Sequence, residues 1–277
     1  MPHFTSSDGR AIAFSDSGGT AQTQLCLAGL TRDRRDFTDL AAHLSDRYRV
    51  VSMDYRGRGE SDWATDPIAE YHPMVEGRDA LELMAHLGIT EFGVIGTSRG
   101  GLIGMGLAAQ LPAMIRTLVL NDVGPVLDPS GIAVIMSHLG RPLNYPDFNA
   151  AAHGLEAVFE DDFPGLSNER WLKFARTLFH EQDGRPMLSY DTKLRNSVQA
   201  AIDGPATDLW PIFDAINCPM LLLRGENSAL LGRSTVEEMR VRKPALTAVE
   251  VKDRGHCPFL DEPEALDAID AFLAAHQ

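Results

Sequence analysis

The sequence has few cysteines and no long hydrophobic run. Its three cysteines, Cys26, Cys218 and Cys257, are odd in number and far apart, so a disulfide framework is not expected and a reducing compartment is favoured. No apolar stretch approaches the ~18 residues that suggest a membrane span. The first residues lack the basic and apolar regions of a signal peptide. These absences predict a cytoplasmic protein with no membrane partner.

Positive charge is also scarce. Lys and Arg number 25 against 39 Asp and Glu, and the net charge of −14 repels nucleic acid. The chain of 277 residues is 44% hydrophobic and 23% charged, which is the composition of a globular protein with a substantial core. We therefore expect a small-molecule substrate and no nucleic-acid partner, while a homo-oligomer remains open.

Short apolar runs alternate with amphipathic stretches along the chain. The amphipathic stretches have helical spacing, and this alternation predicts a doubly wound, mostly parallel sheet covered on both faces. A hairpin around Asp8-Gly9 precedes it. The predicted strands are Leu25–Ala28, Tyr48–Met53, Phe92–Ile95, Thr117–Leu120, Met220–Leu223 and Thr247–Val251.

The alternation is interrupted once, between Val126 and Asp208. Here the pattern turns helical, with Pro and Gly punctuation and scattered aromatics. We interpret residues 126–208 as a helical cap inserted into a core domain of residues 1–125 and 209–277. Such an insertion would lie over the carboxyl edge of the sheet, where open α/β sheets bind ligands.

The strongest chemical signal is Gly96-Thr97-Ser98-Arg99-Gly100, which follows one predicted strand and opens a helix. This G-x-S-x-G pattern indicates a sharp strand-to-helix turn that exposes the serine oxygen, with small residues allowing strand and helix to approach closely. The amino end of the helix also points its positive dipole toward a developing oxyanion. Ser98 is therefore the predicted nucleophile.

A serine hydroxyl needs a general base at neutral pH. Of nine histidines, His256 stands in Asp253-Arg254-Gly255-His256-Cys257-Pro258, after the last predicted strand and before the last helix. A loop in this place lies at the same sheet edge as Ser98. We predict that His256 is the base and that Cys257 beside it only fills space.

These features resemble the α/β-hydrolase fold over almost the whole chain, in particular serine esterases and lactonases with a helical cap. Four motifs occur in the order that the family shows, and together they are specific for fold and weakly specific for substrate. The motifs are Ala28-Gly29-Leu30, Asp54-Tyr55-Arg56-Gly57-Arg58-Gly59-Glu60-Ser61, Gly96 to Gly100, and Gly255-His256.

The resemblance implies an oxyanion hole formed by the backbone N–H groups of Leu30 and Arg99. Because main-chain groups donate there, Ala28 can replace the histidine that the family usually has. The turn from Asp54 to Ser61 is interpreted as structural, with Arg56 in a local ion pair.

The acidic member of the triad departs from the family pattern. Much of the family has Asp where this chain has Ala229, which cannot accept a hydrogen bond from a histidine. Asp122, at the end of the strand after the nucleophile helix, is the preferred substitute, because haloalkane dehalogenases and some other relatives carry their acid there. Glu226 and a site without an acid remain alternatives, and a native Asp replaced by Ala229 would give the same sequence.

The expected activity is hydrolysis of a carboxylic ester or lactone through an acyl-enzyme, with no cofactor and no metal. The side chain of Arg99, like Arg32, Arg34 and Arg35, either attracts an anionic substrate or forms a local ion pair, and the ion pair is favoured. A carbon–carbon bond hydrolase acting on vinylogous diketo acids is an alternative that would need an arginine near the pocket. A non-catalytic ligand-binding pseudoenzyme is the other alternative, and Ala229 is its main support.

Overall fold

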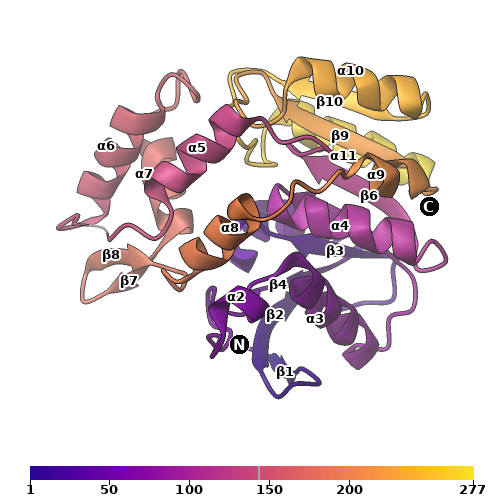
Figure 1. Ribbon diagram of the computed structural model, residues 1–277, viewed down its shortest axis with the longest axis horizontal. Helices are drawn as coiled ribbons and strands as arrows, with labels where there is room; N and C mark the ends of the chain where they lie inside the picture. The colour runs from indigo at the N-terminus through magenta and orange to yellow at the C-terminus, as the bar shows by residue number, and fades with distance from the viewer. Residues whose placement is uncertain (143) are drawn as a thin grey trace.

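The computed structural model describes residues 1–142 and 144–277, and a sheet of eight strands forms the centre of this part (Figure 1). The spatial order of the strands is β1-β2-β4-β3-β5-β6-β9-β10. Strands β1 and β2 pair antiparallel, β2 also pairs antiparallel with β4, and all pairs from β4 to β10 are parallel. The strands are β1 (His3–Thr5), β2 (Ala11–Asp16), β3 (Thr23–Leu27), β4 (Arg49–Met53), β5 (Phe92–Thr97), β6 (Ile115–Asn121), β9 (Met220–Gly225) and β10 (Thr247–Val251).

Helices cover both faces of this sheet, as the alternating pattern predicts. α4 contacts β3, β5 and β6 and packs beside α3 and α9, while α1 contacts β4 and α11 contacts β9 and β10. No helix of the described ranges is both long and apolar enough to cross a membrane. The helices of the core are η1 (Arg34–Phe37), α1 (Thr38–Leu44), α2 (Pro67–Glu70), α3 (Pro73–His86), α4 (Arg99–Gln110), α9 (Trp210–Ala215), α10 (Arg233–Arg242) and α11 (Pro263–Ala275).

The central strands are apolar because helices pack on both of their faces. Every residue of β3, β5 and β9 is buried, including the run Met220–Leu223. A parallel strand in this position has no solvent-facing side, so its sequence is a continuous hydrophobic run and not an alternating one. Because β3, β5 and β6 run parallel, their carboxyl ends and the loops that follow them lie at one edge of a rigid sheet.

The segment between β6 and β9 contains helices and a hairpin. Its elements are α5 (Pro129–His138), α6 (Phe148–Phe159), α7 (Asn168–Leu178), β7 (Phe179–Gln182), β8 (Arg185–Leu188) and α8 (Leu194–Asp203), and they extend to one side of the sheet (Figure 1). The helical pattern of this segment did not reveal the hairpin. Its strands are short and mostly exposed, so they lack a regular apolar alternation, although Asp183-Gly184 at the tip is a typical two-residue turn.

A separate hydrophobic cluster joins α6, α7 and the loop between them, and it includes Phe163, Trp171 and Ala175. The core domain also holds this segment directly, because the Arg35 guanidinium donates hydrogen bonds to the carbonyl oxygens of Arg176 and Phe179 at 3.1 and 2.8 Å. On these grounds we retain, as a proposal, the division into a core of residues 1–125 and 209–277 and a cap of residues 126–208.

Candidate active site

Ser98 lies in the sharp turn between β5 and α4. Its backbone has φ 49° and ψ −110°, which few non-glycine residues adopt. The two glycines of the motif explain how the turn closes. A Cβ at Gly96 would lie 2.5 Å from the backbone of Gly100, and one at Gly100 would lie 2.0 Å from the carbonyl oxygen of Leu27. The strained turn and the absence of side chains at these two positions expose the Ser98 hydroxyl at the end of the strand.

The imidazole of His256 reaches Ser98 across 158 residues of sequence. Nε2 lies 2.9 Å from Ser98 Oγ, and Nδ1 lies 2.7 Å from Asp122 Oδ2. With the proton on Nδ1, His256 donates to Asp122 and accepts from the serine hydroxyl. The three side chains predicted from the sequence thus lie in one hydrogen-bonded line.

Asp122 directly follows β6 and is fully buried. Besides the His256 bond, its carboxylate accepts hydrogen bonds from the Gly225 backbone N–H at 2.9 Å and from Ser228 Oγ at 2.6 Å. Glu226 is used elsewhere, since its carboxylate accepts from the backbone N–H of Asp253. The position occupied by Ala229 therefore need not supply an acid.

Two backbone N–H groups lie at the ends of the neighbouring strands. Leu30 stands in a turn after β3, closed by a 3.1 Å hydrogen bond from the Arg32 N–H to the Gly29 carbonyl, and Arg99 is the first residue of α4. Within residues 1–142 and 144–277, neither the Leu30 nor the Arg99 N–H donates to the protein. Both residues match the positions that the resemblance assigns to an oxyanion hole, and this role stays a prediction.

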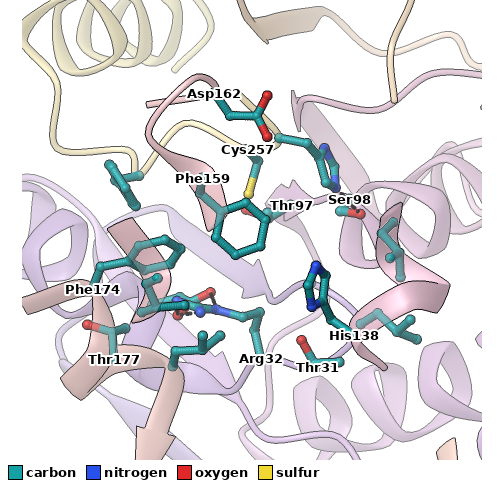
Figure 2. A pocket seen from close by; sticks show the side chains of 18 of the residues that line it. Thr31, Arg32, Thr97, Ser98, His138, Phe159, Asp162, Phe174, Thr177 and Cys257 are labelled. Carbon is teal, nitrogen blue, oxygen red and sulfur yellow. Dashed lines mark hydrogen bonds and ion pairs between the residues drawn. The ribbon is translucent and has the colours of Figure 1, made fainter. Parts of the chain in front are cut away.

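A cavity of about 330 Å³ opens beside the hydroxyl of Ser98. Gly29, Leu30, Ser98 and His256 border it on the core side, and α5, α6, α7 and the hairpin supply most of the opposite wall. Its lining is largely apolar, and Figure 2 shows Phe159 and Phe174 across the cavity from Ser98. A largely apolar cavity beside a candidate nucleophile suits an apolar part of a small substrate.

Sequence reasoning missed the polar side chains that face this cavity from the cap segment. Figure 2 shows His138 and Asp162 pointing into it. Burial raises the pKa of the Asp162 carboxyl, and the neighbouring Asp161 adds to the effect. The sequence carries no signal for either residue, because a helical histidine and an acidic pair at a helix end are ordinary surface features.

Two arginines near the site, Arg99 and Arg56, form the structural ion pairs expected of them. The Arg99 side chain points away from the cavity and binds the buried Glu76 of α3, with Nε 2.7 Å from Oε2. Arg56 is completely buried and binds Asp79 of α3 at 2.8 Å, and it also reaches Asp8 and Glu70. The expected pairing of Arg56 is thus present, but its partners are distant in sequence.

Cys257 borders the cavity next to His256. Burial raises the pKa of its thiol far above the ordinary value, and the nearby carboxylates of Asp122 and Asp36 raise it further. A thiol that stays protonated is a poor nucleophile. This agrees with the interpretation of Cys257 as a space-filling residue.

Residues 24–269 match the model of the alpha/beta hydrolase family. The chain belongs to this family. An alpha/beta hydrolase from Novosphingobium aromaticivorans of known crystal structure is 40% identical, with a TM-score of 0.92 over 99% of this chain and 97% of that one. The match extends through the elbow and the histidine loop, so the fold and the recognition predicted from the motifs are confirmed.

Curated relatives of this alpha/beta hydrolase include hydrolases of several kinds. A 3-hydroxybutyrate-oligomer hydrolase from Cupriavidus necator is 37% identical over 262 residues, which cover 91% of this chain and 89% of that protein. A 2-(acetamidomethylene)succinate hydrolase from Mesorhizobium japonicum is 26% identical over 93% of this chain and 90% of its own length. The similarity therefore supports hydrolysis, while the bond that is cleaved differs among relatives.

Proposed function

We propose that this protein hydrolyses small carboxylic esters or lactones through a covalent serine intermediate. The observation that carries the proposal is the hydrogen-bonded line from Ser98 through His256 to Asp122 at the wall of an apolar cavity. The hydrogen bond between Asp122 and His256 also removes the main argument for a non-catalytic binding protein, which was the alanine at position 229.

The proposed reaction has two steps. Ser98 attacks the carbonyl carbon while His256 takes its proton, and the Leu30 and Arg99 N–H groups stabilise the oxyanion. His256 then protonates the leaving alcohol, and water, deprotonated by the same imidazole, releases the acid from Ser98. Asp122 keeps the imidazole in the required tautomer and stabilises its charged form. Each backbone donor of such a hole typically contributes about 3 kcal/mol to transition-state stability.

The charges around the cavity favour an ester over a diketo acid. A diketo acid carries a carboxylate and needs a cation that no carboxylate already neutralises. Among the described residues, four of the five cations bordering the cavity are already in ion pairs, namely Arg32 with Asp36, Arg35 with Asp33, Arg170 with Asp261, and Lys173 with Asp39 and Asp261. The fifth, Arg141, is exposed and forms no ion pair in the described ranges, so it is the one cation left for a substrate carboxylate. An uncharged substrate avoids the repulsion from these carboxylates.

The 37% identical relative suggests which esters to try first. That protein is named for 3-hydroxybutyrate oligomers, which are short-chain oligoesters. We infer that short esters of hydroxy acids are the first substrates to test here, together with simple butanoate esters and small lactones.

The decisive experiment compares the wild-type protein with Ser98→Ala on 4-nitrophenyl butanoate. We expect saturable turnover with a burst of 4-nitrophenol in the wild type, and a loss of about 10⁴-fold or more in kcat in the variant, because the covalent step requires the serine oxygen. Ser234→Ala, an exposed serine on α10, serves as the control and should keep wild-type rates. Full activity of Ser98→Ala would overturn the proposed mechanism, and saturable binding without turnover in the wild type would favour a binding protein.

A further inference from the structure

An ion pair lies against the same apolar cavity as the proposed nucleophile. Arg32 Nε lies 3.0 and 2.8 Å from the two carboxylate oxygens of Asp36, and Nη2 lies 2.6 Å from Oδ1. Both side chains are only 14% exposed, and both border the cavity. Removing an ion pair from water is costly, and this pair shares that cost with the buried Arg56–Asp79 pair; it differs from that pair in lying on the wall of the cavity.

The position of Arg32 follows from the turn that carries Leu30. The hydrogen bond from the Arg32 N–H to the Gly29 carbonyl closes this turn, and the stem of Arg32 packs on Gly29, where a Cβ would lie 3.2 Å from its Cγ. The guanidinium then passes beneath the Phe174 ring, with Cζ 5.4 Å from the ring centroid (Figure 2). The ion pair thus borders the cavity into which the chain of an ester would extend from the Leu30 N–H.

Part of the guanidinium remains free to bind a ligand. A guanidinium carries N–H donors on Nε, Nη1 and Nη2, and Asp36 occupies Nε and one side of Nη2. Nη1 of Arg32 donates to no residue in the described ranges. An apolar cavity with a few fixed donors is the usual form of a selective small-molecule site.

The charge balance determines which group fits these donors. Asp36 neutralises the guanidinium directly, and the Asp33 carboxylate also acts on it. A carboxylate on the substrate would therefore meet two fixed negative charges beside the arginine. A neutral oxygen can accept from Nη1 without this repulsion, and a hydroxyl can also donate to Asp36.

We propose that Arg32 and Asp36 form a subsite that selects esters bearing a second, uncharged oxygen, either a hydroxyl or another ester carbonyl, on the chain that enters the cavity. This proposal rests on the proposed ester hydrolysis and states which esters the enzyme would select. An ester with an alkyl group in that place covers the accessible Nη1 donor of Arg32 without giving it a partner, and sites of this kind discriminate strongly against such analogues.

Two esters of equal shape test the subsite. Methyl 3-hydroxybutanoate and methyl 3-methylbutanoate differ only by a hydroxyl in place of a methyl group. We expect the wild-type kcat/KM to favour the hydroxy ester at least about tenfold, because only that ester satisfies the Arg32 donors. In the double variant Arg32→Met/Asp36→Leu, which replaces the ion pair with apolar side chains, the ratio should fall to about one.

The matched control is Arg49→Met/Asp16→Leu. Arg49 and Asp16 form a comparable ion pair, through two hydrogen bonds, with 18% and 17% exposed side chains, but they do not border the cavity, so the ratio should remain at the wild-type value. If the cavity double variant does not fold, Arg32→Lys keeps the charge and loses the forked donor, and it should lower the ratio several-fold.

Equal wild-type rates for the two esters, or a preference that persists in folded Arg32 variants, would overturn the subsite while leaving ester hydrolysis intact. Failure of the wild type to turn over 4-nitrophenyl butanoate and both methyl esters would instead overturn the proposed function, and the subsite with it.

Discussion

The carboxylate of Asp122 accepts hydrogen bonds from His256, from the Gly225 N–H and from the Ser228 hydroxyl. The last two partners belong to the end of β9 and the loop after it, where the family usually places its acid. They fix the carboxylate so that one oxygen remains aligned with the imidazole. At the scale of single residues, the site therefore depends on a loop that holds the acid as much as on the acid itself.

The exchange Asp122→Asn tests this arrangement. We expect kcat/KM for 4-nitrophenyl butanoate to fall by about 10³- to 10⁴-fold, because an amide favours the wrong imidazole tautomer and cannot stabilise its charged form. Glu226→Gln is the matched control and should change the rate by less than about threefold, since in the described ranges the Glu226 carboxylate accepts only from the backbone N–H of Asp253. Wild-type activity in Asp122→Asn would show that the acid lies elsewhere.

The elbow between β5 and α4 shows how an element is shaped by close backbone contacts. Gly100 and Gly106 belong to the same helix, but Gly100 faces the carbonyl of Leu27 whereas a Cβ at Gly106 would find its nearest neighbour, Gln110 Nε2, at 3.9 Å. The helical pattern predicts both as helix residues and does not distinguish them. Only the packing of α4 on the sheet shows that Gly100 is required and that Gly106 can be replaced.

Gly100→Ala should therefore destabilise the protein by about 2 kcal/mol or more, because the new methyl group overlaps backbone atoms that cannot move without displacing β3. Gly106→Ala should instead stabilise it by roughly 0.5–1 kcal/mol through the higher helix propensity of alanine. Urea unfolding of the two variants measures both effects. Equal stabilities would contradict the close approach of α4 to β3 at Gly100.

At the scale of the whole molecule, the buried Arg56 and the partly buried Arg10 connect the amino-terminal hairpin to α2 and α3. Arg56 binds Asp8, Glu70 and Asp79, and Arg10 binds Glu70 at 2.9 Å. Burial alone would raise the pKa of Glu70, but hydrogen bonds from the Asp66 N–H, Arg10 and Thr65 outweigh it and lower the pKa to about 2. The charged form of Glu70 thus stabilises the fold.

This shift predicts a pH-dependent difference between the wild type and Glu70→Gln. Because the folded pKa lies below the unfolded value, the stability contributed by Glu70 is fully present above the unfolded pKa, about 4.3, and is lost as the pH falls toward 2. The wild type should have the higher melting temperature at pH 6, and the two curves should converge between about pH 4 and pH 2.5. A constant difference over this range would show that Glu70 acts through its shape and not its charge.

Local patterns were sufficient to predict most strands, the elbow serine and the histidine loop. Each depends on neighbours in sequence: a buried parallel strand must be continuously apolar, and a tight strand-to-helix turn requires small residues around Ser98. The same reasoning missed the β7–β8 hairpin and α2, whose short, largely exposed sequences carry no strong periodicity.

The sequence by itself determined the fold family and singled out Ser98 and His256 as the candidate reactive side chains, because those features follow from the chain's local periodicity and from fixed motif spacing. The tertiary structure decided which acid meets His256, where the arginines point, and that Arg32 and Asp36, an ordinary pair four residues apart, border a covered cavity. Such facts depend on packing between segments that are 23 residues apart for Arg99 and Glu76 and 134 residues apart for Asp122 and His256, and the distance along the chain holds no information about the distance in space.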